Sequence, residues 1–185
     1  MRDEDADLGR VWLDAVCERF RQQKELAAKA AARLDDAAFF QPLGSGENSV
    51  AILMKHMGGN LRSRWTAFLT SDGEKPDRRR DAEFEIEEGD TRERILEGWE
   101  EGWRLALGTL GSLEPVDLPG IVTLRGETLG VVAAVERQLA HAAYHTGQIV
   151  LLARHLVGEE AWASLSIPRG ASDEFTERVR RAAQG

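Results

Sequence analysis

The chain of 185 residues has one cysteine, one tyrosine and no long apolar run. Because one cysteine cannot form an internal disulfide, we expect no dependence on an oxidising compartment. The first ten residues, MRDEDADLGR, are acidic where a secretory signal peptide would be basic and then apolar. No stretch approaches the roughly 18 consecutive apolar residues that a membrane-spanning helix needs. These absences predict a cytoplasmic protein without a membrane anchor.

The chain also lacks an excess of basic residues, since it has 24 lysines and arginines and 32 aspartates and glutamates. The formal net charge of −8 argues against the broad basic surface by which proteins bind nucleic-acid phosphates or anionic lipids. We therefore expect neither nucleic acid nor a membrane as a partner. The length is enough for one domain with a real core and short for two, so we expect a single domain over residues 1–185.

Apolar residues recur at steps of three and four along most of the chain, and glycines or prolines separate these stretches. Such spacing is typical of amphipathic helices. It predicts an all-α four-helix bundle, or another all-α packing of the same pieces, with a short C-terminal helix beginning near Ser172. Asn48 or Ser49 can cap the second helix, and Ile121–Leu124 is a candidate extended segment. The four long helices are expected near residues 6–34, 48–69, 91–111 and 128–157.

The fourth of these helices is unusual because residues 138–153 carry no formal charge. We expect it to be buried on most sides, where an unpartnered polar group costs about 1–3 kcal/mol. Its polar residues are Gln138, His141, Tyr144, His145, Thr146 and Gln148. His141 and His145 are four residues apart, so their imidazoles share one face of the helix and can bind one ion. Ala142 stands where a zinc protease with an HExxH motif has its glutamate, which excludes that class.

His56 is the third candidate ligand and lies at the border of the apolar face of the second helix. A histidine there can also be a residue at the edge of the core, hydrogen-bonded to a carbonyl group. A bundle would bring it close to His141 and His145, whereas His155 lies off their line and is interpreted as structural. We therefore predict one divalent ion bound by His56, His141 and His145. Its binding should weaken as pH falls, because a protonated ring has no lone pair.

The chain resembles the DinB/YfiT-like superfamily in three separated segments, SVAILMKHMGGNLRSRW (49–65), HAAYHTGQIVLLAR (141–154) and WASLSIPRG (162–170). A further segment, TSDGEKPDRRRDAEFE (70–85), resembles a branch of that superfamily without assigned function. The resemblance implies a four-helix bundle of the DinB/YfiT-like type, usually a homodimer. It also implies one metal ion held by a histidine of the second helix and two of the fourth. The matching residues here are His56, His141 and His145.

The resemblance leaves the reaction open. Some relatives are metal-dependent thiol transferases that use low-molecular-weight thiols such as bacillithiol or mycothiol, and others act in maleylpyruvate isomerisation or hydrolysis. Three protein ligands leave a coordination position free, as in catalytic zinc sites, and a metal there lowers the pKa of a bound water or thiol. Zinc or nickel is the expected ion, and Asn60 and Gln148 are expected to orient the bound group.

Three hypotheses follow for the function. The first is a metal-dependent enzyme, either a thiol (S-)transferase or a hydrolase. The second is a non-catalytic stress protein that binds a metal or a small molecule. The third is a structural dimeric bundle whose histidines bind no metal. The sequence favours metal binding over the third hypothesis but leaves open whether the protein is an enzyme.

Several other residues have two interpretations. Arg62, Arg64 and the arginines of 78–80 are interpreted as a solvated face, and the alternative is contact with an anionic part of a substrate. They flank or belong to the polar connection 70–90, which is long for a compact domain, and such loops are often functional.

Cys17 is interpreted as a small buried hydrophobe rather than a nucleophile. Helical spacing predicts core positions for Trp12, Trp65, Trp99 and Trp103.

Overall fold

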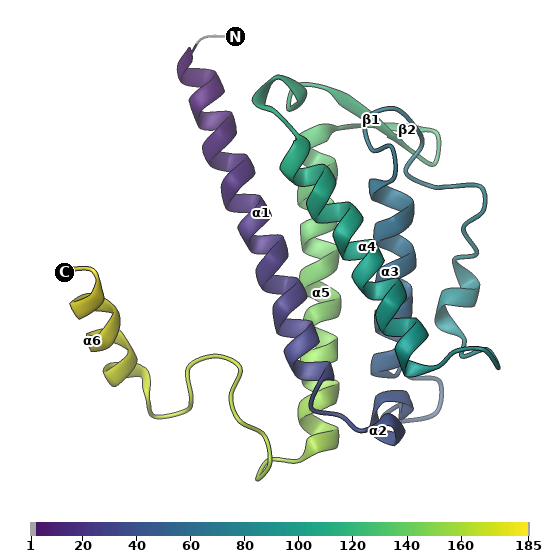
Figure 1. Cartoon of the computed structure of the whole chain (residues 1–185), viewed down its shortest axis with the longest axis vertical. Helices are drawn as coiled ribbons and strands as arrows, with labels where there is room; N and C mark the ends of the chain where they lie inside the picture. Colours follow the sequence, from purple (N-terminus) through teal and green to yellow (C-terminus); the bar gives the residue numbers. More distant parts are fainter. Residues whose placement is uncertain (1–2, 185) are drawn as a thin grey trace.

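Four long helices pack side by side as a bundle, and a short helix follows them (Figure 1). The structure, a computed structural model, describes residues 3–184 and the side chains from residue 7 onward. The helices are α1 (Asp3–Ala31), α3 (Val50–Trp65), α4 (Arg92–Ser112), α5 (Val131–Val157) and α6 (Ser172–Ala182). The prediction of an all-α four-helix bundle with a short C-terminal helix is confirmed.

The connections contain shorter elements. These are α2 (Asp36–Phe40), the 3-10 turns η1 (Asp81–Phe84) and η2 (Pro115–Asp117), and an antiparallel hairpin of β1 (Ile121–Leu124) and β2 (Glu127–Gly130). The expected extended segment is β1, but its partner β2 was not predicted. Arg125 and Gly126 join the strands with φ values of 55° and 78°, as the two central residues of a tight hairpin turn require. The hairpin lies at the end of the bundle where α5 begins (Figure 1).

The ends of the helices differ from the prediction where the backbone turns. The second long helix ends at Trp65 rather than near residue 69, because Ala67 adopts a φ of 49° that no α-helix contains. The first ends at Ala31 rather than 34. The fourth begins at Val131 rather than 128, because the hairpin takes residues 127–130.

The N-termini of α3 and α4 are capped by hydroxyl side chains. Ser49 Oγ accepts the N–H of Ile52 at 3.3 Å at the start of α3, so Ser49 is the cap of this helix. Thr91 Oγ1 accepts the N–H of Arg94 at 3.3 Å, so α4 begins one residue after the predicted position. Both contacts satisfy backbone donors that the first helical turn leaves unpaired.

The aromatic core lies among α1, α3 and α4. Trp65, Trp99 and Trp103 are buried, and Phe20 of α1 meets Trp65 and Trp103 edge to face with ring centroids 5.8 and 6.2 Å apart. The core positions predicted for these tryptophans are confirmed, and Trp12 packs partly buried against the same core. Cys17 is buried too, and this burial raises the pKa of its thiol, as expected for a small hydrophobe.

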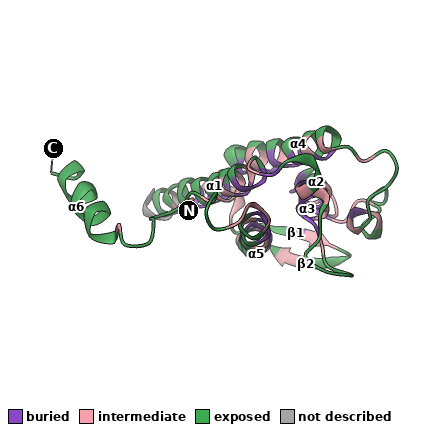
Figure 2. Ribbon diagram, turned by 90° about the horizontal axis from the view of Figure 1, so that it is seen from below, coloured by how far each residue is buried: buried purple, intermediate pink, exposed green. Residues whose placement is uncertain are grey.

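Helix α5 is exposed along one face, contrary to the expectation that it is buried on most sides. Tyr144 and Leu151 are 64% and 65% exposed, although the opposite face is buried in the bundle. Figure 2 shows α6 standing apart from the bundle, and none of its residues is buried. Within residues 3–184, no helix combines the length and apolar character that crossing a membrane requires.

Helices α3 and α4 approach so closely that their backbones touch at glycines. A Cβ atom added to Gly102 would lie 2.6 Å from the carbonyl oxygen of Gly58, and one added to Gly58 would lie 2.7 Å from that of Gly98. Both distances are far below van der Waals contact, and the obstructing atoms are backbone. Because His56 is two positions from Gly58, this contact turns the histidine away from α4 and towards α5.

Replacing Gly102 by alanine is expected to lower the free energy of unfolding by about 1–3 kcal/mol, because the new methyl group forces the two helices apart. Gly108→Ala is the matched control on the same helix. A Cβ atom at Gly108 meets nothing within 4 Å, so alanine there should raise stability by about 0.5–1 kcal/mol. Urea denaturation of both variants measures these changes. Equal effects of the two substitutions would contradict the close contact.

Candidate metal centre

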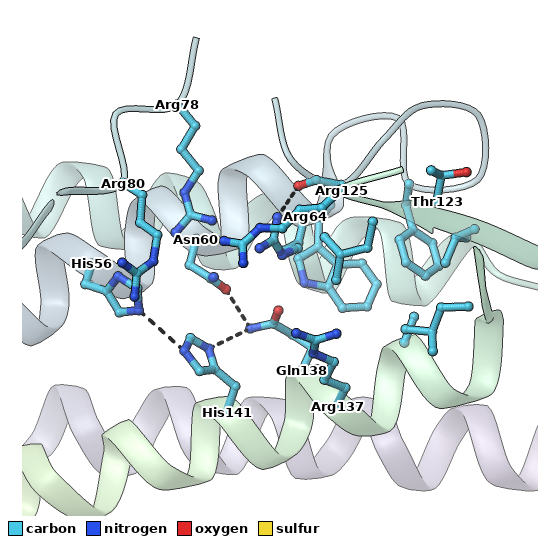
Figure 3. A pocket seen from close by; sticks show the side chains of 17 residues that line it. His56, Asn60, Arg64, Arg78, Arg80, Thr123, Arg125, Arg137, Gln138 and His141 are labelled. Carbon is cyan, nitrogen blue, oxygen red and sulfur yellow. Dashed lines mark hydrogen bonds between the residues drawn. The ribbon is translucent and has the colours of Figure 1, made fainter. Parts of the chain in front are cut away.

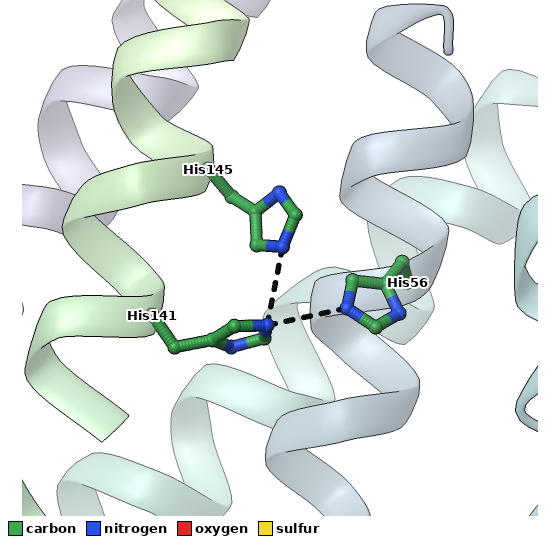
Figure 4. Close-up of side chains that lie close together, drawn as sticks. All are labelled: His56, His141 and His145. Carbon is green, nitrogen blue, oxygen red and sulfur yellow. Dashed lines mark hydrogen bonds between the residues drawn. The ribbon is translucent and has the colours of Figure 1, made fainter. Parts of the chain in front are cut away.

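Three imidazole rings meet between α3 and α5 (Figure 4). His56 comes from α3, and His141 and His145 come from successive turns of α5. The Nε2 atom of His141 lies 3.1 Å from that of His145 and 3.4 Å from that of His56. The ligand atoms of all three side chains lie within 4.8 Å of one another. The structure therefore brings together the three histidines that the sequence singled out.

The cluster has the dimensions of a site for one metal ion. A tetrahedral ion with nitrogen ligands at about 2.0–2.1 Å has ligands about 3.3–3.4 Å apart, close to the two Nε2 separations here. Imidazole ligands suit zinc and nickel. The donor set and its spacing therefore fit one divalent ion.

Burial keeps two of the rings neutral. Loss of hydration, together with the neighbouring histidines, lowers the pKa of His141 to about 3. The same causes lower the pKa of His145 to about 4. Both rings therefore retain a lone pair near neutral pH, and protons compete for them only well below the ordinary imidazole range.

The outer nitrogen atoms of two rings are held by acceptors. His56 Nδ1 lies 2.9 Å from Glu83 Oε2, and His145 Nδ1 lies 2.7 Å from Gln148 Oε1. An acceptor at Nδ1 fixes the proton on that atom and leaves Nε2 free to bind a metal. Gln148 thus contacts His145, as its place one turn later suggests.

The third ring contacts the amide of Gln138, which in turn bonds to the amide of Asn60. Asn60 Oδ1 accepts a hydrogen bond from Gln138 Nε2 at 3.0 Å, and Gln138 Nε2 lies 3.4 Å from His141 Nδ1. Asn60 therefore reaches the cluster through Gln138 rather than directly (Figure 3). No role was assigned to Gln138 from the sequence, although its position in the uncharged stretch marked it as a polar residue in need of a partner.

Glu83 is the main residue that the sequence did not single out. Its carboxylate is buried and lies between His56 and Arg78, whose Nε and guanidinium NH2 donate to Oε1 and Oε2, both at 2.8 Å. Burial alone would raise the pKa of Glu83, but the hydrogen bonds from Arg78 and His56 outweigh it and lower this pKa. Glu83 therefore remains a carboxylate and holds His56 in place.

The long connection 70–90 thus forms a wall of the candidate site. Its η1 turn carries Glu83 and also Phe84, whose ring lies over His56 with centroids 4.5 Å apart. Gly59 makes room for the turn, since a Cβ atom there would lie 2.8 Å from the carboxyl carbon of Glu83. The length of the connection was the only signal in the sequence that pointed to this contact.

The arginines divide into two groups. Arg62 and Arg79 are exposed, which confirms for them the interpretation as a solvated face. The same interpretation is wrong for Arg64 and Arg78, whose side chains are 15% and 3% exposed and form ion pairs with acidic residues of the 70–90 connection. His155 is exposed near the end of α5 and takes no part in the cluster.

The cluster opens onto a cavity of about 210 Å³ (Figure 3). His56 and His141 lie at one end, beside Asn60 and Gln138. Arginine side chains line its middle, and apolar side chains of α3 and the β-hairpin line the rest. A group bound at the histidines would therefore face an enclosed space large enough for a small molecule.

Comparison with known proteins assigns the chain to a family. A family model described as a protein of unknown function (DUF1572) matches residues 7–171. No curated protein and no solved structure matches the chain. The wider DinB/YfiT-like resemblance is not addressed by these findings and stays a prediction. The chain belongs to the family of proteins of unknown function DUF1572.

Proposed function

We propose that the protein binds one divalent metal ion, zinc or nickel, through His56, His141 and His145 and uses it as a thiol (S-)transferase. The observation that carries the proposal is the convergence of three Nε2 atoms beside a cavity. Thiol transfer is one of the activities found among proteins of the DinB/YfiT-like superfamily that the chain resembles.

A bound divalent ion lowers the pKa of a thiol or a water on its free side and so supplies a nucleophile near neutral pH. The residues of the chain orient the ligands. Glu83 keeps the proton of His56 on Nδ1, and Gln148 does the same for His145. Asn60 and Gln138 present amide groups to the cavity and can hydrogen-bond a bound group.

The cavity has no side chain suited to act as a general base. Its lining residues, all within the described part of the chain, include no aspartate, glutamate, lysine or cysteine. A thiol or a water activated by a metal ion needs no such base, so this lining is compatible with transfer of a thiol and also with hydrolysis. The same lack of a base favours, as a second candidate, a non-catalytic protein that binds a metal or a small molecule.

An assay of thiol transfer separates these candidates. Protein purified without a histidine tag is loaded with zinc or nickel and incubated with a panel of low-molecular-weight thiols and electrophiles. We expect turnover above background that the His145→Ala variant lacks. If no thiol gives turnover while small molecules still bind, the non-catalytic binder is the better assignment.

We also propose a homodimer. Tyr144 and Leu151 are seven residues apart on α5, so the two exposed apolar side chains share one face that a second copy can cover. Sedimentation equilibrium should give about twice the monomer mass of 20.5 kDa. A mass of one chain across micromolar concentrations would contradict the dimer.

A further inference from the structure

The cavity beside the histidines is basic in a protein whose net charge is −8. Acidic residues outnumber basic ones over the whole chain, yet the cavity lining contains five arginines and no carboxylate. The five are Arg64, Arg78, Arg80, Arg125 and Arg137 (Figure 3). Several arginines gathered in one cavity of a protein with a negative net charge are typical of a site that binds an anion.

The nearby carboxylates offset only part of this charge. Glu83 pairs with Arg78, and Glu74 is shared among three arginines. Glu74 lies 3.0 Å from both Arg64 and Arg125 and 3.4 Å from Arg78. These carboxylates fix the orientation of the guanidinium groups while leaving the cavity with an excess of positive charge.

Two arginines have donors available for a ligand. Arg137 has no hydrogen bond or ion pair within the described residues, and it precedes His141 by one helical turn on the same side of α5 (Figure 3). Among the described residues, the one hydrogen-bonding partner of the Arg80 side chain is Asp81 Oδ1, at 3.5 Å, and that aspartate is 98% exposed; the guanidinium group also lies over the Phe84 ring. Their guanidinium groups can therefore donate to an anion in the cavity without breaking an internal pair.

The far end of the cavity is apolar. Trp65 and Phe68 line it from α3 and the turn that follows, and Val122 and Leu129 line it from facing positions of the β-hairpin. Its volume of about 210 Å³ is below the ~300–1,000 Å³ typical of sites for drug-sized ligands. The occupant must therefore be small, with an apolar body beside its polar group.

We infer that the cavity binds a small organic anion, an apolar body that carries a carboxylate or a phosphate. Its anionic group contacts Arg137 and the arginines opposite, its body lies against Trp65 and Phe68, and the remaining end faces the histidines. This inference rests on the proposed function, because it names the substrate class of the same metal centre. The binding itself depends on the arginines and not on the metal.

Isothermal titration calorimetry with four ligands that each contain one benzene ring tests the inference. Phenyl phosphate and benzoate distinguish the two anionic groups, while benzamide and benzylamine are the neutral and cationic analogues. We expect at least one anion to bind at least tenfold more tightly than either analogue. Arg137→Gln should weaken that anion by about tenfold to a hundredfold, the value of a lost hydrogen bond between charged groups. Arg62→Gln, an exposed arginine outside this cavity, is the matched control and should change nothing.

Three results would each overturn the inference. Benzamide could bind as tightly as the anions, or the Arg137→Gln and Arg62→Gln substitutions could have equal effects. The third is that neither anion binds at millimolar concentration. Measuring bound metal on the same samples separates it from the proposed function. Arginine-dependent binding of an anion by protein that binds no metal would support the anion site and reject the metal enzyme. Full metal content without anion binding would reject the anion site alone.

Discussion

Replacing His141 by alanine is expected to reduce bound metal from one equivalent per chain to none. Its Nε2 atom is the one that lies within 3.4 Å of both other Nε2 atoms, so its removal takes away the centre of the cluster. Loss of residues that merely orient a ligand costs about 10–100-fold in metal affinity, and loss of a ligand should cost more than that. Elemental analysis of untagged protein after dialysis measures the remaining metal.

His155→Ala is the control for this substitution. His155 lies on the same helix but is exposed and stands apart from the cluster, so this variant should keep a full equivalent of metal. Circular dichroism of both variants verifies that the helices are intact. Full metal content in the His141→Ala variant would show that the ion binds elsewhere.

Replacing Glu83 by glutamine should weaken metal binding by about 10–100-fold without removing any ligand. The amide oxygen is a weaker acceptor than the carboxylate for the Nδ1 proton of His56, so Nε2 becomes a weaker ligand for the ion. The same substitution takes a charged partner from the buried Arg78 and should lower the free energy of unfolding by about 1.5–3 kcal/mol. A competitive chelator titration and urea denaturation measure the two effects.

Glu85→Gln serves as the matched control, since this glutamate is exposed two residues further along the same connection. It should leave both the metal affinity and the stability unchanged. If the Glu83→Gln variant bound metal as tightly as the wild type, the contact with His56 would be structural only. A loss of stability without a loss of affinity would lead to the same conclusion.

The helices could be predicted from the sequence because the period of their apolar residues is a local property. Some of their ends could not, because those ends depend on contacts between distant segments. The turn at Arg125 and Gly126 is held by Asp72, whose carboxylate accepts both backbone N–H groups at 2.8 and 2.7 Å. A residue more than fifty positions away thus holds the turn of the hairpin, and no local pattern reveals this contact.

The candidate site divides in the same way. The four-residue spacing of His141 and His145 is visible within one helix. His56 was predicted from its place on the second helix of a bundle, and the resemblance to a known superfamily supported it. Glu83 contacts His56 across a connection without periodicity, so nothing local links the two residues. The burial of the arginines could not be predicted either, because Arg62 and Arg64 have similar surroundings in the sequence. Only the packing of the 70–90 connection buries Arg64 and leaves Arg62 exposed.

An X-ray absorption spectrum of the zinc-loaded protein tests the central claim most directly, because it counts the ligands and identifies the imidazoles. We expect three histidine nitrogens at about 2.0–2.1 Å, with one further light atom completing the shell. The His141→Ala variant should show no such spectrum. A zinc environment with fewer than three imidazoles, or one made of carboxylates or sulfur, would contradict a metal centre formed by His56, His141 and His145.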